Sequence, residues 1–188
     1  MNITNFPYKN GPWTILSRKL AYDGKYAKLY EDEVVRPDGT EGIHIYLPTK
    51  DGVSILPYDK DGNVYLISIF RYSHQDYLIE LTAGGIDKGE DHLIAAKREL
   101  KEETGIVGKN YELVAITAPK SEIYSAKDYT YICEVEKFEE NRIENTENIK
   151  LIKMKLKDAL GMVDKLEIFQ ASAIIALLKL KDKFNKTS

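Results

Sequence analysis

The chain has 188 residues, of which 43% are hydrophobic and 30% charged, and its formal net charge is −3. This length can bury a proper core, and the charge excludes the polycationic surface that binding to nucleic acid or an anionic membrane would require. No signal sequence or apolar run of roughly 18 residues is present, and the lone Cys133 cannot form an internal disulfide, so we expect a soluble cytoplasmic protein.

The first 48 residues predict an antiparallel β-meander. Strands are expected within residues 13–24, 26–39 and 41–48, with Asp-Gly turns at 23–24 and 38–39. Aromatic residues recur in these strands, among them Trp13, Tyr30 and Tyr46. They are suited either to stacking on a nucleotide base or to core packing, and the sequence does not decide between the two.

The remaining residues, 49–188, alternate between strands and helices. Residues 53–72 predict a hairpin that turns at Asp61-Gly62; its DKDGN run has the glycine too early for a calcium loop. Further strands are expected at 77–82, 113–117, 129–136 and 149–154, and helices at 157–165 and 168–184. Cys133 falls in a strand that reads as buried, which predicts a core thiol.

The segment from 84 to 106 is the most informative part of the chain. Apolar residues at Leu93, Ala96 and Leu100 predict a helix over 91–104, which Gly105 is placed to end. Three glutamates then lie on one patch of the helix, beside its apolar stripe. Their charges repel one another, so the patch is unfavourable unless a cation binds there. A hard divalent metal bound together with substrate phosphates fits this arrangement, whereas the alternative is a solvated acidic helix face.

The same segment resembles the signature of the Nudix hydrolases, G-x5-E-x7-R-E-(aliphatic)-x-E-E-x-G-(aliphatic). The residues that match its fixed positions are Gly84, Glu90, Arg98, Glu99, Leu100, Glu102, Glu103, Gly105 and Ile106. The resemblance implies an α+β fold, an α/β/α sandwich in which a mixed sheet is flanked by helices. It also implies a loop-helix-loop that binds divalent cations bridging the diphosphate of the substrate.

The resemblance carries specific roles over to matching residues. The metal ligands would be Glu99, Glu102 and Glu103, with the backbone carbonyl of Ala83, and the metal Mg²⁺ or alternatively Mn²⁺. Glu90 and Arg98 match an ion pair that braces the helix. The histidines His44, His74 and His92 are scattered at no ligand spacing, and we interpret them as surface or packing residues.

Two segments before the signature indicate a branch of the family. S-I-F-R-Y and Y-L-I-E-L-T-A-G-G resemble segments of ADP-ribose and nucleoside-diphosphate-sugar pyrophosphatases, and they place Arg71 and Glu80 on the substrate side. An arginine fork suits a diphosphate, a carboxylate suits ribose hydroxyls, and Gly85 allows backbone to approach a ligand. Thr82 stands where the family has proline, and Pro119 is out of register with the family's later proline.

In this branch the N-terminal meander serves dimerisation, and a late glutamate is the general base. We therefore expect a homodimer with a catalytic glutamate in R-I-E-N-T-E-N-I-K, where Glu147 and Glu144 both fit and Glu147 lies closer to the next strand. Glu102 is the third candidate catalytic carboxylate. The predicted reaction is hydrolysis of ADP-ribose or a related nucleotide sugar; GDP-mannose and a non-catalytic ADP-ribose-binding module are the alternatives.

Overall fold

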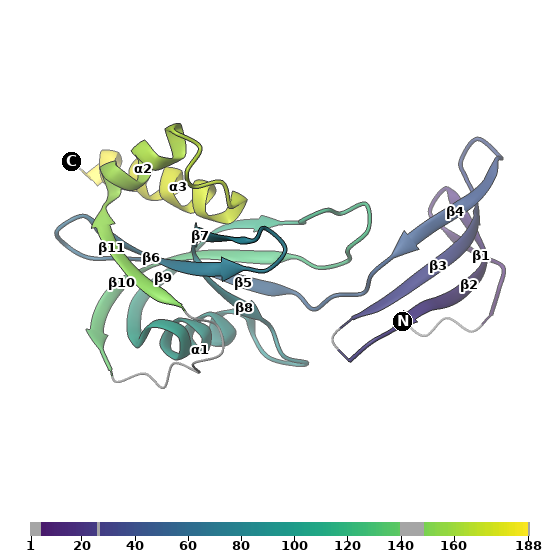
Figure 1. The fold of residues 1–188 in the computed structure, drawn as a ribbon, viewed down its shortest axis with the longest axis horizontal. Coiled ribbons are helices and arrows are strands. Elements are labelled where there is room, and N and C mark those ends of the chain that lie inside the picture. Colours follow the sequence, from purple (N-terminus) through teal and green to yellow (C-terminus); the bar gives the residue numbers. More distant parts are fainter. Residues whose placement is uncertain (1–4, 26, 140–148, 188) are drawn as a thin grey trace. The chain divides into compact units, whose positions relative to one another are not determined.

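The computed structural model describes residues 5–25, 27–139 and 149–187 (Figure 1). The chain divides into two compact units. One unit comprises Met1–Lys50 with Ala118–Ala126, and the other comprises Asp51–Thr117 with Lys127–Ser188. We refer to them as the N-terminal unit and the larger unit.

The N-terminal unit is built on a four-stranded antiparallel sheet. Its strands run in the order β1 (Tyr8–Asn10), β2 (Trp13–Asp23), β3 (Lys28–Val35) and β4 (Glu41–Tyr46). The three strands predicted from the sequence are confirmed as β2, β3 and β4. Strand β1 was not predicted, because three residues are too few to show an alternating pattern. The later segment 118–126 joins this unit through a parallel bridge between Leu47 and Tyr124.

The larger unit contains a mixed sheet of seven strands. They are β5 (Gly52–Tyr58), β6 (Asn63–Arg71), β7 (Asp76–Glu80), β8 (Thr82–Gly85), β9 (Ile106–Thr117), β10 (Asp128–Phe138) and β11 (Lys150–Lys155). The order is β11-β6-β5-β10-β9, with β7 paired to β6 and β8 paired to β5. Strands β5 and β10 are parallel, and the other pairs are antiparallel.

Three helices cover the two faces of this sheet, as Figure 1 shows: α1 (His92–Thr104) on one face, α2 (Leu156–Asp164) and α3 (Ala171–Thr187) on the other. Strand β5 serves both sides, because alternate side chains point to opposite faces. Val53 and Ile55 pack in the cluster under α1, whereas Leu56 and Tyr58 pack in the cluster under α2 and α3. The predicted α/β/α sandwich is confirmed.

The buried cysteine belongs to the cluster under α1. Cys133 is fully buried on β10, and burial raises the pKa of its thiol to about 12. A thiol held in this way is neutral and unreactive at physiological pH. The prediction of a core thiol is confirmed.

The turn between β5 and β6 is tight, as predicted. The carboxylate of Asp59 accepts the backbone N–H groups of Asp61 (3.0 Å) and Asn63 (2.9 Å), and Gly62 adopts a positive φ of 74°. The aspartate thus closes the turn on its own backbone. The same contacts explain why the DKDGN run is a turn.

Two predicted strands differ from the observed ones. The strand expected at 77–82 is two strands, β7 and β8, because the chain leaves its pairing with β6 and joins β5 at the buried Leu81. The strand expected at 113–117 begins at Ile106, directly after α1, and continues to Thr117. The last two helices lie within a few residues of the predicted bounds.

Candidate functional site

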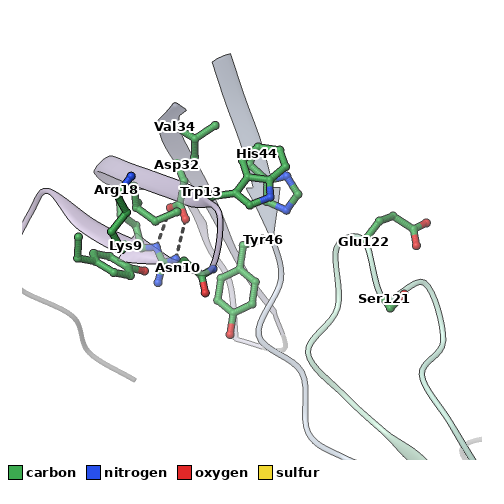
Figure 2. Close-up of a pocket in the computed structure, with 12 residues that line it drawn as sticks. Lys9, Asn10, Trp13, Arg18, Asp32, Val34, His44, Tyr46, Ser121 and Glu122 are labelled. Carbon is green, nitrogen blue, oxygen red and sulfur yellow. Dashed lines mark hydrogen bonds and ion pairs between the residues drawn. The ribbon is translucent and has the colours of Figure 1, made fainter. Parts of the chain in front are cut away.

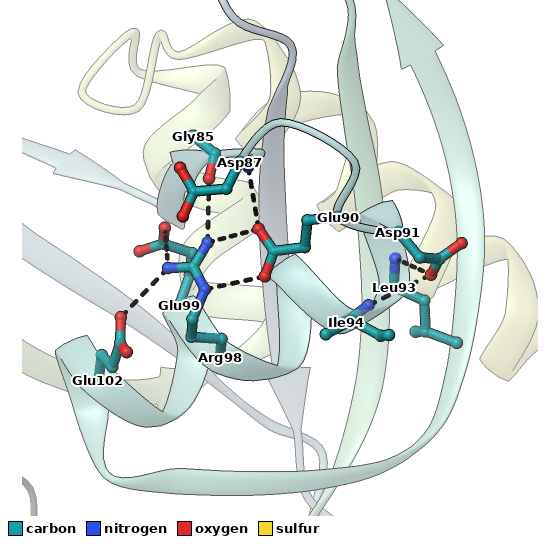
Figure 3. Close-up of polar contacts among 9 residues, drawn as sticks. All are labelled: Gly85, Asp87, Glu90, Asp91, Leu93, Ile94, Arg98, Glu99 and Glu102. Atoms are coloured by element: carbon teal, nitrogen blue, oxygen red, sulfur yellow. Dashed lines mark hydrogen bonds and ion pairs between the residues drawn. The ribbon is translucent and has the colours of Figure 1, made fainter.

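The helix α1 is capped at both ends. Oδ1 of Asp91 accepts the backbone N–H groups of Leu93 (2.8 Å) and Ile94 (3.3 Å) (Figure 3). At the other end Gly105 has a left-handed φ of 70°, and its N–H donates to the carbonyl of Lys101 (2.9 Å). An asparagine or glycine tolerates this conformation better than other residues do, so Gly105 terminates the helix as the sequence predicts.

The apolar face of α1 sets the direction of its charged side chains. Ala95, Ala96 and Leu100 are fully buried in the cluster shared with β5 and β10. Small residues at 95 and 96 allow the helix to lie close to the sheet. The glutamates are offset around the helix from this stripe, and Glu99 lies against Gly84 of β8.

Arg98 is the centre of the charged cluster, as Figure 3 shows. Its Nε and Nη2 donate to the two oxygens of Glu90 (3.0 and 2.9 Å), and Nη2 also donates to the carbonyl of Gly85 (3.1 Å). Its Nη1 donates to Glu99 (2.7 Å) and Glu102 (3.2 Å). These bonds, chiefly those to Glu90, raise the pKa of the Arg98 guanidinium above its ordinary value. One arginine thus joins the loop, the helix and β8.

Glu90 ties the loop before α1 to this arginine. Its carboxylate also accepts the backbone N–H of Asp87 (3.0 Å), and its own N–H donates to the carbonyl of Asp87 (2.9 Å). Gly89 has a positive φ of 83°, which allows the chain to turn here. The structure therefore brings Glu90 and Arg98 together, as expected of a brace, while the bracing role itself stays a prediction.

Glu99 lies unusually close to the backbone of β8. A Cβ atom at Gly84 would fall 2.0 Å from the carboxyl carbon of Glu99. Burial raises the pKa of the Glu99 carboxyl, while the adjacent Arg98 opposes this rise. Glycine is required at position 84 for a steric reason, because any side chain there would occupy the space of the partly desolvated Glu99 carboxylate. This space lies beside β8, the strand that carries Ala83.

The two remaining signature glutamates differ in environment. The side chain of Glu102 is 59% exposed, whereas Oε2 of Glu103 is buried. Across residues 5–25, 27–139 and 149–187, no three acidic, histidine or cysteine side chains converge closely enough to hold a metal ion. Nη1 of Arg98 contacts both Glu99 and Glu102, so a cation bound by these two carboxylates would have to share them with the arginine. The donors are hard oxygens of the type that a divalent cation prefers.

The predicted substrate-side residues Arg71 and Glu80 contact each other. Nη2 and Nε of Arg71 donate to Oε2 of Glu80 at 2.6 and 3.1 Å. The Glu80 side chain is 8% exposed and that of Arg71 is 38% exposed, so the arginine is the accessible member of the pair. The hairpin between β6 and β7 sets this contact, which the sequence motifs alone do not predict.

One residue near this pair was not identified from the sequence. Oε1 of Gln170 accepts the backbone N–H of Leu81 (2.8 Å), and its Nε2 lies 3.5 Å from Glu80. No motif marks Gln170, and its only sequence signal is its place directly before a helix. The candidate general bases Glu144 and Glu147 fall outside the part of the chain that the structure describes.

The N-terminal unit has a cavity of about 880 Å³ on its sheet (Figure 2). Arg18 and the buried Asp32 form a bidentate ion pair in its wall, with distances of 2.7 and 2.6 Å. Arg18 also lies over the rings of Tyr30 and Tyr46, 5.5 and 5.0 Å from their centroids. Trp13 and Tyr46 line the cavity, whereas Tyr30 is not among its lining residues.

Comparisons with known proteins agree with the site. Residues 48–177 match the NUDIX domain family, and residues 13–47 match the nucleoside diphosphate sugar hydrolase N-terminal domain. An ADP-ribose pyrophosphatase of Bacillus subtilis is 27% identical over 173 residues, 89% of this chain and 92% of the relative. A methanol dehydrogenase activator of Bacillus methanolicus is 24% identical, covering 85% of this chain and 88% of the relative.

The crystal structure of an ADP compounds hydrolase has the same fold. Its TM-score is 0.85 at 19% identity, and the match covers 96% of this chain and 98% of the other. No helix in the described part of the chain is both long enough and apolar enough to cross a membrane. The domain match spans most of the sequence and includes the Arg98-centred helix. The chain belongs to the Nudix family and is a hydrolase similar to the ADP-ribose pyrophosphatases.

Proposed function

We propose that this enzyme hydrolyses the diphosphate bond of ADP-ribose or a related nucleoside diphosphate sugar, giving a nucleoside monophosphate and a sugar phosphate. The observation that carries the proposal is the gathering of Glu90, Glu99 and Glu102 around Arg98, against the glycines of β8. The likeness to ADP-ribose pyrophosphatase along nearly the whole chain supports the choice of substrate.

Nudix hydrolases generally need a divalent metal. We assign Mg²⁺, with Mn²⁺ as the alternative, to the carboxylates of Glu99, Glu102 and Glu103 and the carbonyl of Ala83. All of these are oxygen donors, which suits a hard cation. When bound, such an ion neutralises diphosphate charge and acidifies a water molecule. Arg98 restrains the carboxylates of Glu99 and Glu102.

The residues of the chain orient the substrate and the proton acceptor. Arg71 presents a guanidinium fork to a phosphate, and the buried Glu80 fixes the direction of that fork. Gly85 brings backbone close to the ligand. Glu147, or alternatively Glu144, accepts the proton of the attacking water, and Glu102 is the third candidate for this catalytic role.

Two alternatives have distinct requirements. GDP-mannose or another nucleotide sugar would keep the same chemistry and change only the contacts to base and sugar. A non-catalytic ADP-ribose-binding module would need no cluster of carboxylates. The full set of Glu99, Glu102 and Glu103 is retained here, which favours hydrolysis over sensing.

We also propose that residues 1–48 form a dimerisation element and residues 49–188 the hydrolase domain, with a homodimer as the working form. The ordered β-sheet of the N-terminal unit supplies a surface for such an element. A single buried cysteine suits a reducing compartment, so the cytoplasm is our proposal for location.

Phosphate release in the presence of a phosphatase tests the proposed function. The substrates are ADP-ribose, GDP-mannose, UDP-glucose, diadenosine polyphosphates and nucleoside triphosphates, each with and without Mg²⁺. We expect metal-dependent turnover with a preference for ADP-ribose or another nucleotide sugar. Tight binding of ADP-ribose without turnover of any substrate would instead indicate a binding module.

A further inference from the structure

The chain passes from one strand pairing to another at Leu81. Strand β7 pairs with β6 as far as Glu80, which lies opposite Ile67. Strand β8 pairs with β5 from Thr82, which lies opposite Ile55. Leu81 belongs to neither pairing, and its side chain is fully buried. Because a buried backbone N–H must find an acceptor, the N–H of Leu81 requires one from outside the sheet.

The side chain of Gln170 supplies that acceptor. Its Oε1 lies 2.8 Å from the Leu81 nitrogen, and its Nε2 lies 3.5 Å from Oε2 of Glu80. The backbone of Gln170 is itself fixed, because its carbonyl accepts the N–H of Ile174 (3.1 Å) at the start of α3. A helix end on one face of the sheet therefore holds the chain directly beside Glu80.

The surroundings of Glu80 show why the contact between Gln170 and Leu81 is important. A cavity of about 230 Å³ opens beside it, lined by His74, Leu78, Ile79, Glu80, Phe169 and Gln170. Packed side chains therefore do not enclose the Glu80 carboxylate on this side. Its position depends on its polar contacts: the two donors of Arg71 and the amide of Gln170. The same carboxylate sets the direction of the Arg71 fork.

We propose that Gln170 is a positioning residue for substrate binding, acting through Glu80 on Arg71. The proposal rests on the proposed function, in which Arg71 meets the diphosphate. Gln170 fixes the backbone at Leu81 and directs the Glu80 carboxylate toward Arg71. Without the Gln170 contact, the Glu80 side chain can turn toward the cavity, and the Arg71 guanidinium then loses its orientation. This change weakens substrate binding more than it slows the chemical step.

Gln170→Glu separates positioning from folding. The new carboxylate keeps an oxygen acceptor for the Leu81 N–H, so the chain should keep its path at Leu81 even though repulsion from Glu80 lowers the melting temperature. Its second oxygen faces Glu80, and two like charges at such a distance repel, so KM for ADP-ribose should rise about fivefold or more while kcat stays near the wild-type value. Two further charged or titratable side chains lie beside Glu80: Arg71, which binds its carboxylate, and His74, which lines the same cavity.

The pH dependence supplies a second readout for this variant. The ratio of its KM to that of the wild type should fall as the pH is lowered, because one of the two facing carboxyls then takes up a proton. Lys179→Gln is the matched control: it changes the net charge by the same amount on the exposed side of α3 and should leave KM unchanged. Gln170→Met removes the acceptor as well, and should raise KM and lower the melting temperature together.

Wild-type KM in Gln170→Glu, at every pH, would overturn the proposal and leave Gln170 a purely structural residue. A fall in kcat with KM unchanged would overturn it as well. Calorimetric titration of ADP-ribose into each protein in EDTA repeats the comparison without turnover, and the same rise is expected in Kd. Failure of the proposed function is distinct, because the wild type itself would then neither hydrolyse nor bind the nucleotide sugar.

Discussion

Glu99 lies closer to β8 than any side chain at position 84 would permit. Gly84→Ala would place a methyl group 2.0 Å from the Glu99 carboxyl carbon. Because that carbon is the far end of a flexible side chain, the glutamate turns aside and the fold survives. A displacement of this size should lower kcat/KM by about 100-fold while the melting temperature changes little. Steady-state kinetics and thermal unfolding of the same preparation check both parts.

Gly161→Ala in α2 is the control for this substitution. No atom lies within 4 Å of a Cβ built at that position, and the glycine is in a helix. Alanine there should leave activity unchanged and stabilise the protein by roughly 0.5–1 kcal/mol. Unaltered activity of Gly84→Ala would contradict the close approach of Glu99.

Asp128 provides a prediction of pH dependence. Burial raises the pKa of its carboxyl, although hydroxyls of Ser54 (3.0 Å) and Thr130 (3.3 Å) donate to it. A carboxyl whose pKa rises on folding stabilises the folded state fully below its unfolded pKa of about 3.9, and this contribution is lost as the pH rises through the folded value. Asp128→Asn, which has no charge to bury, should therefore be more stable than the wild type at pH 7.

The advantage of Asp128→Asn should shrink as the pH falls through the raised pKa of the folded protein, and it should be gone below the unfolded pKa of about 3.9. Urea denaturation of both proteins at pH 7 and at acid pH measures the difference. A variant that is less stable than the wild type at pH 7 would show that the charged form is favoured at this position.

At the scale of elements, the caps of α1 hold the loop and the helix together. Asp91→Ala removes the acceptor for two backbone N–H groups and should lower the free energy of unfolding by about 1 kcal/mol. Asp91→Asn is the control, because asparagine caps helices about as well as aspartate. Equal stability of the two variants, measured by chemical denaturation, would mean that the cap contributes nothing.

Local signals explain why α1 was predictable. Asp91, Gly105 and the apolar spacing of Leu100 each act within a turn of the helix, so the sequence alone indicates where it begins and ends. The break at Leu81 was not predictable in this way. It arises because β7 pairs with β6 whereas β8, which follows it directly, pairs with β5. Strand pairing is a tertiary property, and no local sequence pattern marks it.

The candidate site likewise combines contacts that the sequence predicts with contacts that depend on the tertiary structure. The signature brought Glu90, Arg98 and Glu99 to one place, and the structure has them in contact. The pairing of Arg71 with Glu80, and the contact of Gln170 with Leu81, join residues that lie 9 and 89 positions apart. Such contacts arise from strand register and helix packing, which composition and periodicity do not encode.

At the scale of the whole molecule, the N-terminal unit contributes a sheet with a partly buried ion pair, Arg18–Asp32. If this unit is the dimerisation element, light scattering after size exclusion should give twice the chain mass of 21.5 kDa. Removal of Arg18 would leave the buried carboxylate of Asp32 without this partner, which destabilises the sheet. Arg18→Met should therefore disturb the sheet and shift the protein toward the monomer. A wild-type protein of monomeric mass would contradict the proposed element.

Turnover of ADP-ribose by Glu103→Gln at saturating Mg²⁺ tests the central claim most directly. Glu136→Gln, which changes an exposed glutamate on β10, serves as the matched control. If Glu103 holds the metal, its amide variant should lose at least about 100-fold in kcat, more than Glu147→Gln loses, with the control unaffected. Near-normal turnover by Glu103→Gln would contradict a metal-dependent hydrolase centred on this helix.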